Sequence, residues 1–119
     1  MSKFVYIERK SKTQTMTIAL NGNLSDAFDF RDYVTGTIHM PAAWTTAEIG
    51  FKVSSEMSGT FVPLYDDATL VTVDVAVDTM VDLGTRLQGC RFVKLWSQNG
   101  TGTNVAQAAA RSLIVSMKS

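Results

Sequence analysis

The side chains best suited to covalent chemistry in this chain are its single histidine and its single cysteine, His39 and Cys90. Nucleophilic catalysis requires a nucleophile and a base within hydrogen-bond reach of each other. His39 alternates out of phase with Ile38 and Met40, so we expect it to face solvent or a partner. Cys90 precedes an apolar strand segment, where a buried structural thiol is expected. We therefore predict that the protein is not an enzyme.

Paired carboxylates could indicate a metal site at Asp66-Asp67. Calcium loops need acidic ligands interleaved at short fixed spacing, with a glycine for the bend. The stretch from Asp66 to Thr69 lacks that pattern, and two adjacent aspartates are common in hairpin turns. The glycine-rich residues 100–103 lack the Lys-Ser/Thr ending of a phosphate loop and indicate a flexible loop. We expect no metal and no cofactor, and we place the remaining acids on the wet side of a strand and its loop: Asp74, Asp78 and Asp82.

Aromatic side chains offer a second kind of site, because an exposed ring beside polar groups can hold a sugar. Trp44 and Trp96 provide the largest rings, and Tyr65 and Asn99 complete a candidate glycan contact. The alternative is that these rings pack in the core or against a partner subunit, which is the commoner fate of tryptophan.

Composition narrows the possible functions. The 119 residues are 45% apolar and 18% charged, which fits one compact domain. Eleven basic residues balance eleven acidic ones, which argues against a dedicated nucleic-acid binder. One cysteine permits no intrachain disulfide, no apolar run approaches the ~20 residues of a membrane span, and residues 1–12 do not resemble a signal peptide. We expect synthesis in a cytoplasm, with assembly into a particle as a possible route out.

Alternation of apolar and polar residues dominates the chain and predicts half-buried strands. Asn21-Gly22 is a typical hairpin turn, and residues 104–111 are the one short helical candidate, which we interpret as a loop with one turn of helix at most. Strands at this spacing, joined by Gly, Asn and Asp, predict an all-β, antiparallel β-sandwich or barrel. The expected strands lie at residues 15–20, 36–40, 49–53, 71–77, 91–97 and 113–117.

The first residues differ from the rest in being basic and loosely patterned. We interpret residues 1–13 as an N-terminal arm and residues 14–119 as a single β-sandwich domain. Phe4 and Tyr6 could stack on nucleic acid, but we favour a solvated tail or an arm that docks on a neighbouring protein. The residues expected to contact a neighbour are Phe4, Tyr6, Arg9 and Trp44.

Several segments together resemble a family of small tailed-phage and prophage virion proteins with jelly-roll or discoidin-like β-sandwiches. The resemblance spans residues 36 to 117 and is carried by the order and spacing of its segments. Within it, we expect Gln107 and Arg111 to tie the last loop to the sheet through hydrogen bonds. The segments are residues 38–45, 49–54, 59–67, 91–97 and 105–113.

The resemblance implies a bacteriophage structural virion protein, most simply a capsid decoration (cement) protein. Its expected partners are the major capsid protein or other virion subunits, with further copies in a homo-oligomer or symmetric array. Neither a membrane nor a specific nucleic acid is expected as a partner. The alternative is a carbohydrate-binding or connecting module of a phage tail or fibre. Because fold alone does not settle function, both remain open at this stage.

Overall fold

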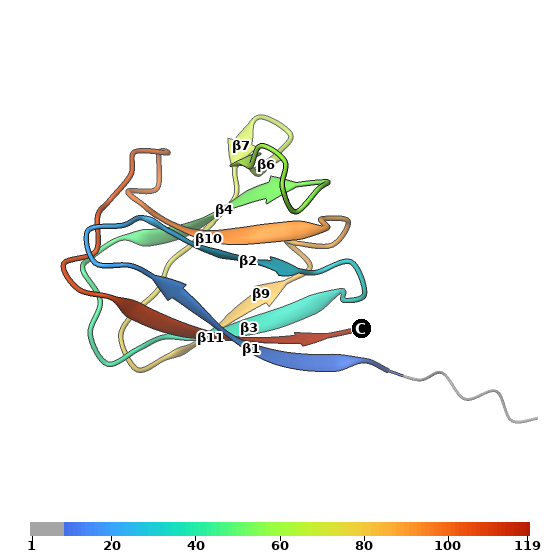
Figure 1. Ribbon diagram of the computed structural model, residues 1–119, viewed down its shortest axis with the longest axis horizontal. Coiled ribbons are helices and arrows are strands. Elements are labelled where there is room, and N and C mark those ends of the chain that lie inside the picture. The colour runs from blue at the N-terminus through green and yellow to red at the C-terminus, as the bar shows by residue number, and fades with distance from the viewer. Residues whose placement is uncertain (1–8) are drawn as a thin grey trace, which may run out of the picture.

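The computed structural model describes residues 9–119, which form strands and no helix (Figure 1). The prediction of an all-β protein is confirmed. These residues contain no helical segment with the length and hydrophobicity that a bilayer span requires. The strands are β1 (Ser11–Ile18), β2 (Leu24–Asp29), β3 (Thr35–His39), β4 (Glu48–Ser54), β5 (Val62–Pro63), β6 (Tyr65–Asp66), β7 (Thr69–Leu70), β8 (Thr72–Val73), β9 (Met80–Gly84), β10 (Phe92–Gln98) and β11 (Arg111–Lys118).

The main sheet is antiparallel and curls into two facing layers (Figure 1). Its strand order is β5-β4-β10-β2-β1-β11-β3-β9, and β8 pairs with β4 beside this path. The short strands β6 and β7 form a separate hairpin. This arrangement is the predicted antiparallel sandwich, in which two layers bury one face each.

Ser25 marks the point where the sheet passes from one layer to the other. It is the one residue of β2 that pairs with β1, opposite Ile18, whereas Leu24 and residues 27–29 pair with β10. The Ser25 hydroxyl accepts a hydrogen bond from the Leu95 N–H at 2.9 Å, where the β2–β10 register shifts. One nearly buried side chain therefore stabilises the irregularity that lets the sheet turn.

The core lies between the two layers and is lined by alternate residues of the long strands. Met16 and Ile18 of β1 are fully buried, and so are Phe51 of β4 and Leu95 of β10. Full burial of such a side chain contributes roughly 1.5–3 kcal/mol relative to leaving it in water. Further fully buried residues of β11, β3, β4 and β10 add to the core: Leu113, Val115, Met117, Ile38, Ile49 and Val93.

Two details of the predicted strands are wrong. Residues 71–77 alternate like a long strand, but only Thr72–Val73 is one, because its pairing with β4 ends after two residues. Val77 is 45% exposed as a result. Leu20, expected on the inner face with Met16 and Ile18, is 60% exposed because β1 ends at Ile18.

Three further segments clarify the sequence patterns. Asn21 has a φ of 63°, and the Gly22 N–H donates to the Ala19 carbonyl, so the predicted turn is present. Met80–Gly84 is not among the expected strands, and it forms strand β9 because it pairs with β3. Residues 104–110 form a loop without helix, and β1 begins at Ser11, so residues 11–13 pair with β11.

Candidate functional site

The two residues best suited to nucleophilic catalysis, His39 and Cys90, lie on different elements of the sandwich. His39 is exposed at the end of β3, between buried Ile38 and Met40, as its phase predicts. Cys90 is half-buried in the turn before β10 and packs against the core. Burial raises the pKa of the Cys90 thiol, which disfavours the reactive thiolate.

The acidic residues separate into a turn and an edge. Asp66 pairs with Thr69 in the β6–β7 hairpin, and Asp67 adopts a φ of 57° at its tip, so the hairpin turn is present. Asp74, Asp78 and Asp82 are exposed. Within residues 9–119, no three His, Cys, Asp or Glu side chains are grouped to hold a metal ion.

Sequence patterns do not indicate the pairing of two carboxyl groups, those of Glu48 and Asp74, that the structure contains. Glu48, at the start of β4, accepts a hydrogen bond from the Thr72 hydroxyl at 3.3 Å and lies beside Asp74. Burial, followed by the neighbouring Asp74 carboxyl, raises the pKa of Glu48, although the Thr72 hydrogen bond opposes this shift. The two acids are far apart in sequence and meet only because β8 pairs with β4.

The tryptophans are packing residues. Trp96 is 3% exposed, and its indole N–H donates to Asn104 Oδ1 at 2.7 Å. The Lys52 ammonium lies 4.7 Å from the centre of the Trp96 ring. Trp44 is half-buried against the core, and its indole N–H donates to the Ala47 carbonyl at 3.2 Å. Trp96 is therefore packed within the protein, which is one of the two expected fates of these rings, and it presents almost no surface to a glycan.

The other two candidate glycan residues are exposed but have different roles. The Asn99 side-chain oxygen accepts hydrogen bonds from the backbone N–H groups of Thr101 and Thr103, so it organises its own loop. Tyr65 is 55% exposed on β6. It lines an open hollow of about 830 Å³ together with Asp66, Asp67, Thr69, Arg86 and Gln88.

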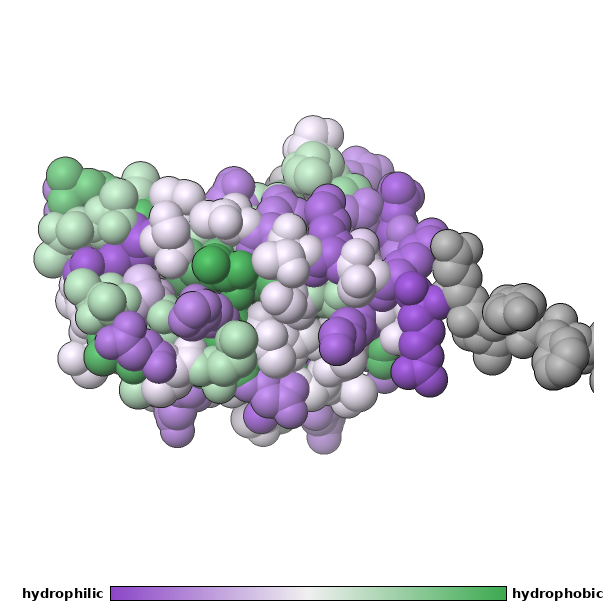
Figure 2. Space-filling view, turned by 90° about the horizontal axis from the view of Figure 1, so that it is seen from below, coloured by the Kyte–Doolittle hydropathy of each residue, from purple (hydrophilic) through white to green (hydrophobic). Residues whose placement is uncertain are grey.

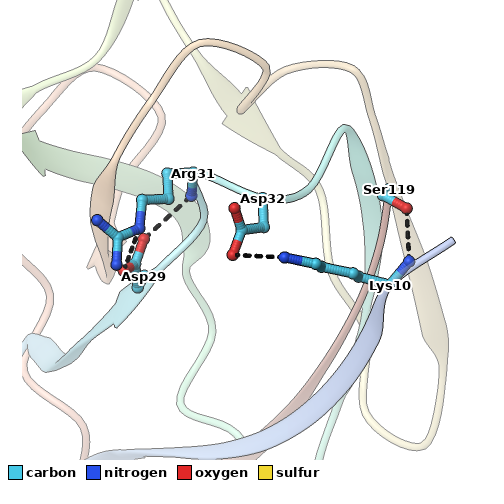
Figure 3. A network of polar contacts seen from close by, with 5 residues as sticks. All are labelled: Lys10, Asp29, Arg31, Asp32 and Ser119. Atoms are coloured by element: carbon cyan, nitrogen blue, oxygen red, sulfur yellow. Dashed lines mark hydrogen bonds and ion pairs between the residues drawn. The ribbon is translucent and has the colours of Figure 1, made fainter. Parts of the chain in front are cut away.

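The arm residues Phe4 and Tyr6 lie outside the described residues, and Arg9 is exposed. From Lys10 on, the chain is attached to the C-terminus: the Lys10 N–H donates to Ser119 Oγ at 2.7 Å, and the Ser119 N–H donates to the Lys10 carbonyl (Figure 3). The Lys10 ammonium lies 3.7 Å from Asp32 Oδ2, and Arg31 pairs with Asp29 at 3.1 Å (Figure 3). Such exposed ion pairs contribute little stability.

Gln107 ties the last loop to the rest of the protein, as predicted. Its side chain is fully buried, accepts from the Thr45 N–H at 2.9 Å and donates to the Thr45 carbonyl at 3.1 Å. It also donates to Ser97 Oγ, and Arg111 Nε donates to its side-chain oxygen at 3.1 Å. The predicted role of Arg111 is present through this contact and through Thr45 Oγ1.

The strands β1, β11, β3 and β9 form one layer of the sandwich, and its outer surface is a regular antiparallel array. Cross-strand pairing places Thr15, Ile114, His39 and Met80 in one row across it. We call this surface the hydroxyl face, because the other outward positions of its three longer strands are mostly Ser and Thr. Those Ser and Thr positions are Ser11, Thr13, Thr17, Thr35, Thr37, Ser112 and Ser116, and Lys118 is the remaining outward position.

Comparison with known proteins gives a match in structure and none in sequence. No known protein family and no curated protein matches the sequence. Among solved structures, the fold is similar to the crystal structure of the SPBc2 prophage-derived protein YomS, with a TM-score of 0.63 and 13% sequence identity. The match covers 98% of this chain and 100% of that chain. At this identity the likeness establishes a shared fold, extending over the whole of both chains.

Proposed function

We propose that the protein is a structural component of a bacteriophage particle, and specifically a capsid decoration protein that binds and stabilises major capsid subunits. The observation that carries the proposal is the likeness to a prophage-derived protein over the full length of both chains. The segment order that resembles small virion proteins supports it from the sequence. The protein would act by binding, in the virion, after synthesis in the host cytoplasm.

The hydroxyl face is suited to such binding. Its strands present small hydroxyl side chains around Ile114. Figure 2 looks onto this side of the sandwich, where a green apolar patch lies among pale and purple side chains. Centres of protein interfaces are depleted of charge, and the row formed by Thr15, Ile114, His39 and Met80 contains no Asp, Glu, Lys or Arg. Repetition over a symmetric shell would let individually weak contacts hold.

A role in binding rather than catalysis also fits the positions of His39 and Cys90. His39 points outward from β3, whereas the Cys90 thiol is half-buried before β10 and its pKa is raised by burial. Neither position offers the activated nucleophile that covalent catalysis uses.

The test is to locate the protein in particles. Phage particles made with and without the gene are purified, and the chain is sought by mass spectrometry and by difference imaging. We expect density on the capsid shell, and we expect particles without the protein to break at lower temperature. Absence of the chain from purified particles would refute the proposal, and density confined to the tail would refute the decoration role.

A second candidate is a carbohydrate-binding or connecting module of a tail or fibre. The observation that favours it is Tyr65, an exposed ring at a hollow that also contains Asp66, Arg86 and Gln88. Aromatic rings beside convergent polar groups are the usual composition of sugar sites. A glycan array with the wild type and Tyr65→Ala tests it: binding that Tyr65→Ala abolishes supports this module, and the absence of any bound glycan counts against it.

A further inference from the structure

Strand β1 has one fully paired edge and one largely unpaired edge. It pairs with β11 over its whole length, from Ser11 opposite Lys118 to Ile18 opposite Arg111. On its other side it meets β2 only at Ile18, because β2 continues into the opposite layer (Figure 1). Among residues 9–119, no strand pairs with residues 11–17 on that side. An edge of this kind is a template for another strand.

The alternation of the backbone identifies the groups that this edge presents. The Lys10 N–H and carbonyl bond to Ser119 at the end of β11, so even-numbered residues of β1 are directed toward β11. The Thr17 N–H, in contrast, is directed away from β11 and donates to Asp26 Oδ1 at 3.0 Å. Ser11, Thr13 and Thr15 share the orientation of Thr17, so their N–H and carbonyl groups are directed toward the open edge.

The open edge is complementary to itself. Antiparallel pairing of β1 with the same strand of a second copy, about a two-fold axis at Thr13, places Thr13 opposite Thr13. It places Ser11 opposite Thr15, and Lys12 opposite Gln14. The outward-directed backbone groups of Ser11, Thr13 and Thr15 all find partners, and no like charges face each other. Cross-strand pairs of Thr and Ser are favourable in antiparallel sheets.

The other edge of the β1–β11–β3–β9 layer, strand β9, is not complementary to itself. Self-pairing of β9 about its centre would place Asp82 opposite Asp82, and like charges in that position repel. The Asp82 side chain also accepts the Gly84 N–H at 2.8 Å, which bends the strand end. The edge strand of the other layer, β5, has only two residues, one of which is Pro63. Charge, a bend and proline are common ways in which natural sheets prevent edge pairing. Residues 11–15 of β1 contain no proline, and their one charged residue, Lys12, lies opposite Gln14 in the self-pairing.

We propose that two copies of the chain associate through antiparallel pairing of β1 with β1 about a two-fold axis at Thr13. Their β1–β11–β3–β9 layers then form one continuous sheet. The two hydroxyl faces become a single extended surface. The inference deepens the proposed structural role and rests on it for its biological meaning, but the association itself is a property of the purified protein.

The experiment uses opposite charges at the two-fold axis. Thr13 is exposed, so Thr13→Lys and Thr13→Glu leave the core intact, and in either homodimer the new charge lies opposite itself. We expect the wild type to sediment as a dimer and each variant alone to dissociate with a dimer dissociation constant raised about tenfold or more, because like charges in contact are costly. An equimolar mixture of the two variants should form heterodimers, visible by native mass spectrometry.

A matched pair of variants on β9 serves as the control. Met80 is 64% exposed on the outer edge strand, and Met80→Lys and Met80→Glu carry the same charges as the test variants. We expect both to sediment as the wild type does, and circular dichroism to show that all four variants are folded.

Three results would overturn the inference: a wild type that stays monomeric as concentration rises, a dimer that both Thr13 variants leave intact, or dissociation that mixing does not reverse. Particle imaging tests the phage role separately, so failure of either proposal is recognisable on its own.

Discussion

The side-chain amide of Gln107 forms two hydrogen bonds with the backbone of Thr45, the same pair of bonds that a residue of a neighbouring antiparallel strand would form. Its oxygen accepts the Thr45 N–H at 2.9 Å, and its nitrogen donates to the Thr45 carbonyl at 3.1 Å. The backbone of Gln107 is also paired, with Asn21 and Gly22 of the first turn. One residue of a loop without regular structure thus connects three segments that are distant in sequence.

We therefore predict that Gln107→Leu, which keeps the size of the side chain and removes its polar atoms, lowers the free energy of unfolding by about 2–4 kcal/mol. The Thr45 N–H and carbonyl lose their partners, and unpaired groups of this kind are costly. Urea denaturation measures the change. Gln88→Leu, at an exposed position, is the control and should change the free energy of unfolding by less than about 0.5 kcal/mol. Equal effects of the two substitutions would contradict this role of Gln107.

The raised pKa of Glu48 predicts a pH dependence of stability. The folded protein binds the proton of the Glu48 carboxyl more tightly than the unfolded chain does, where the ordinary pKa of this group is 4.5. The stabilisation that this proton binding contributes is therefore complete below pH 4.5. It is lost as the pH rises through the raised pKa of the folded state. We expect the difference in unfolding free energy between wild type and Glu48→Gln to shift against the wild type over this pH range. A difference that is constant with pH would show that Glu48 titrates normally.

Gly100 is predicted to resist substitution for two reasons that can be separated. Its φ of +93° is unfavourable for other residues, and a Cβ there would collide with Glu48 Oε2. Gly89, with a φ of +90°, has open space where a Cβ would lie. We expect Gly100→Ala to lower the melting temperature more than Gly89→Ala does. In a Glu48→Ala background, the effect of Gly100→Ala should fall to that of Gly89→Ala, and a cost that stays the same would exclude the collision.

The Cys90 thiol is predicted to react slowly with a disulfide reagent in the native protein. The side chain is half-buried against the core, and burial raises the pKa of the thiol, so the thiolate fraction is low at neutral pH. We expect the rate of this reaction to rise when the protein is unfolded in urea. The reaction of a small thiol with the same reagent, with and without urea, is the control for the effect of urea on the chemistry. Equal rates in the native and unfolded states would show that the thiol is freely accessible.

The parts of the fold that the sequence predicted well are those where alternation and a long pairing partner coincide. Ile49 and Phe51 share one face of a strand in the sequence pattern. Their strand, β4, pairs with β10 over seven positions, and both residues are buried as expected. Residues 71–77 alternate equally well, yet Val77 is exposed because β4 offers only two positions for pairing. Local pattern indicates which face a strand would bury, but the length of the strand depends on a partner that is remote in sequence.

The candidate site shows the same limit. The role of Gln107 in tying the last loop to the sheet is predictable, because a polar side chain that packs against the sheet needs hydrogen-bond partners, and Gln107 has them. The exposure of Tyr65 and the burial of Trp96 differ because one lies on a short separate hairpin and the other on the central strand β10. The pair of Glu48 and Asp74 was not predictable, because only the pairing of β8 with β4 brings the two acids together.

The pairing of the first strand with the last has a consequence for how the protein is made. Every residue of β1, from Ser11 onward, pairs with a residue of β11. On the ribosome, β1 therefore has no partner along that edge until residues 111–118 have been made. The sandwich closes through contacts between segments about a hundred residues apart, and such long-range pairing is typical of slow folding. Until then, the apolar row that begins with Met16 remains open to other molecules in the cell.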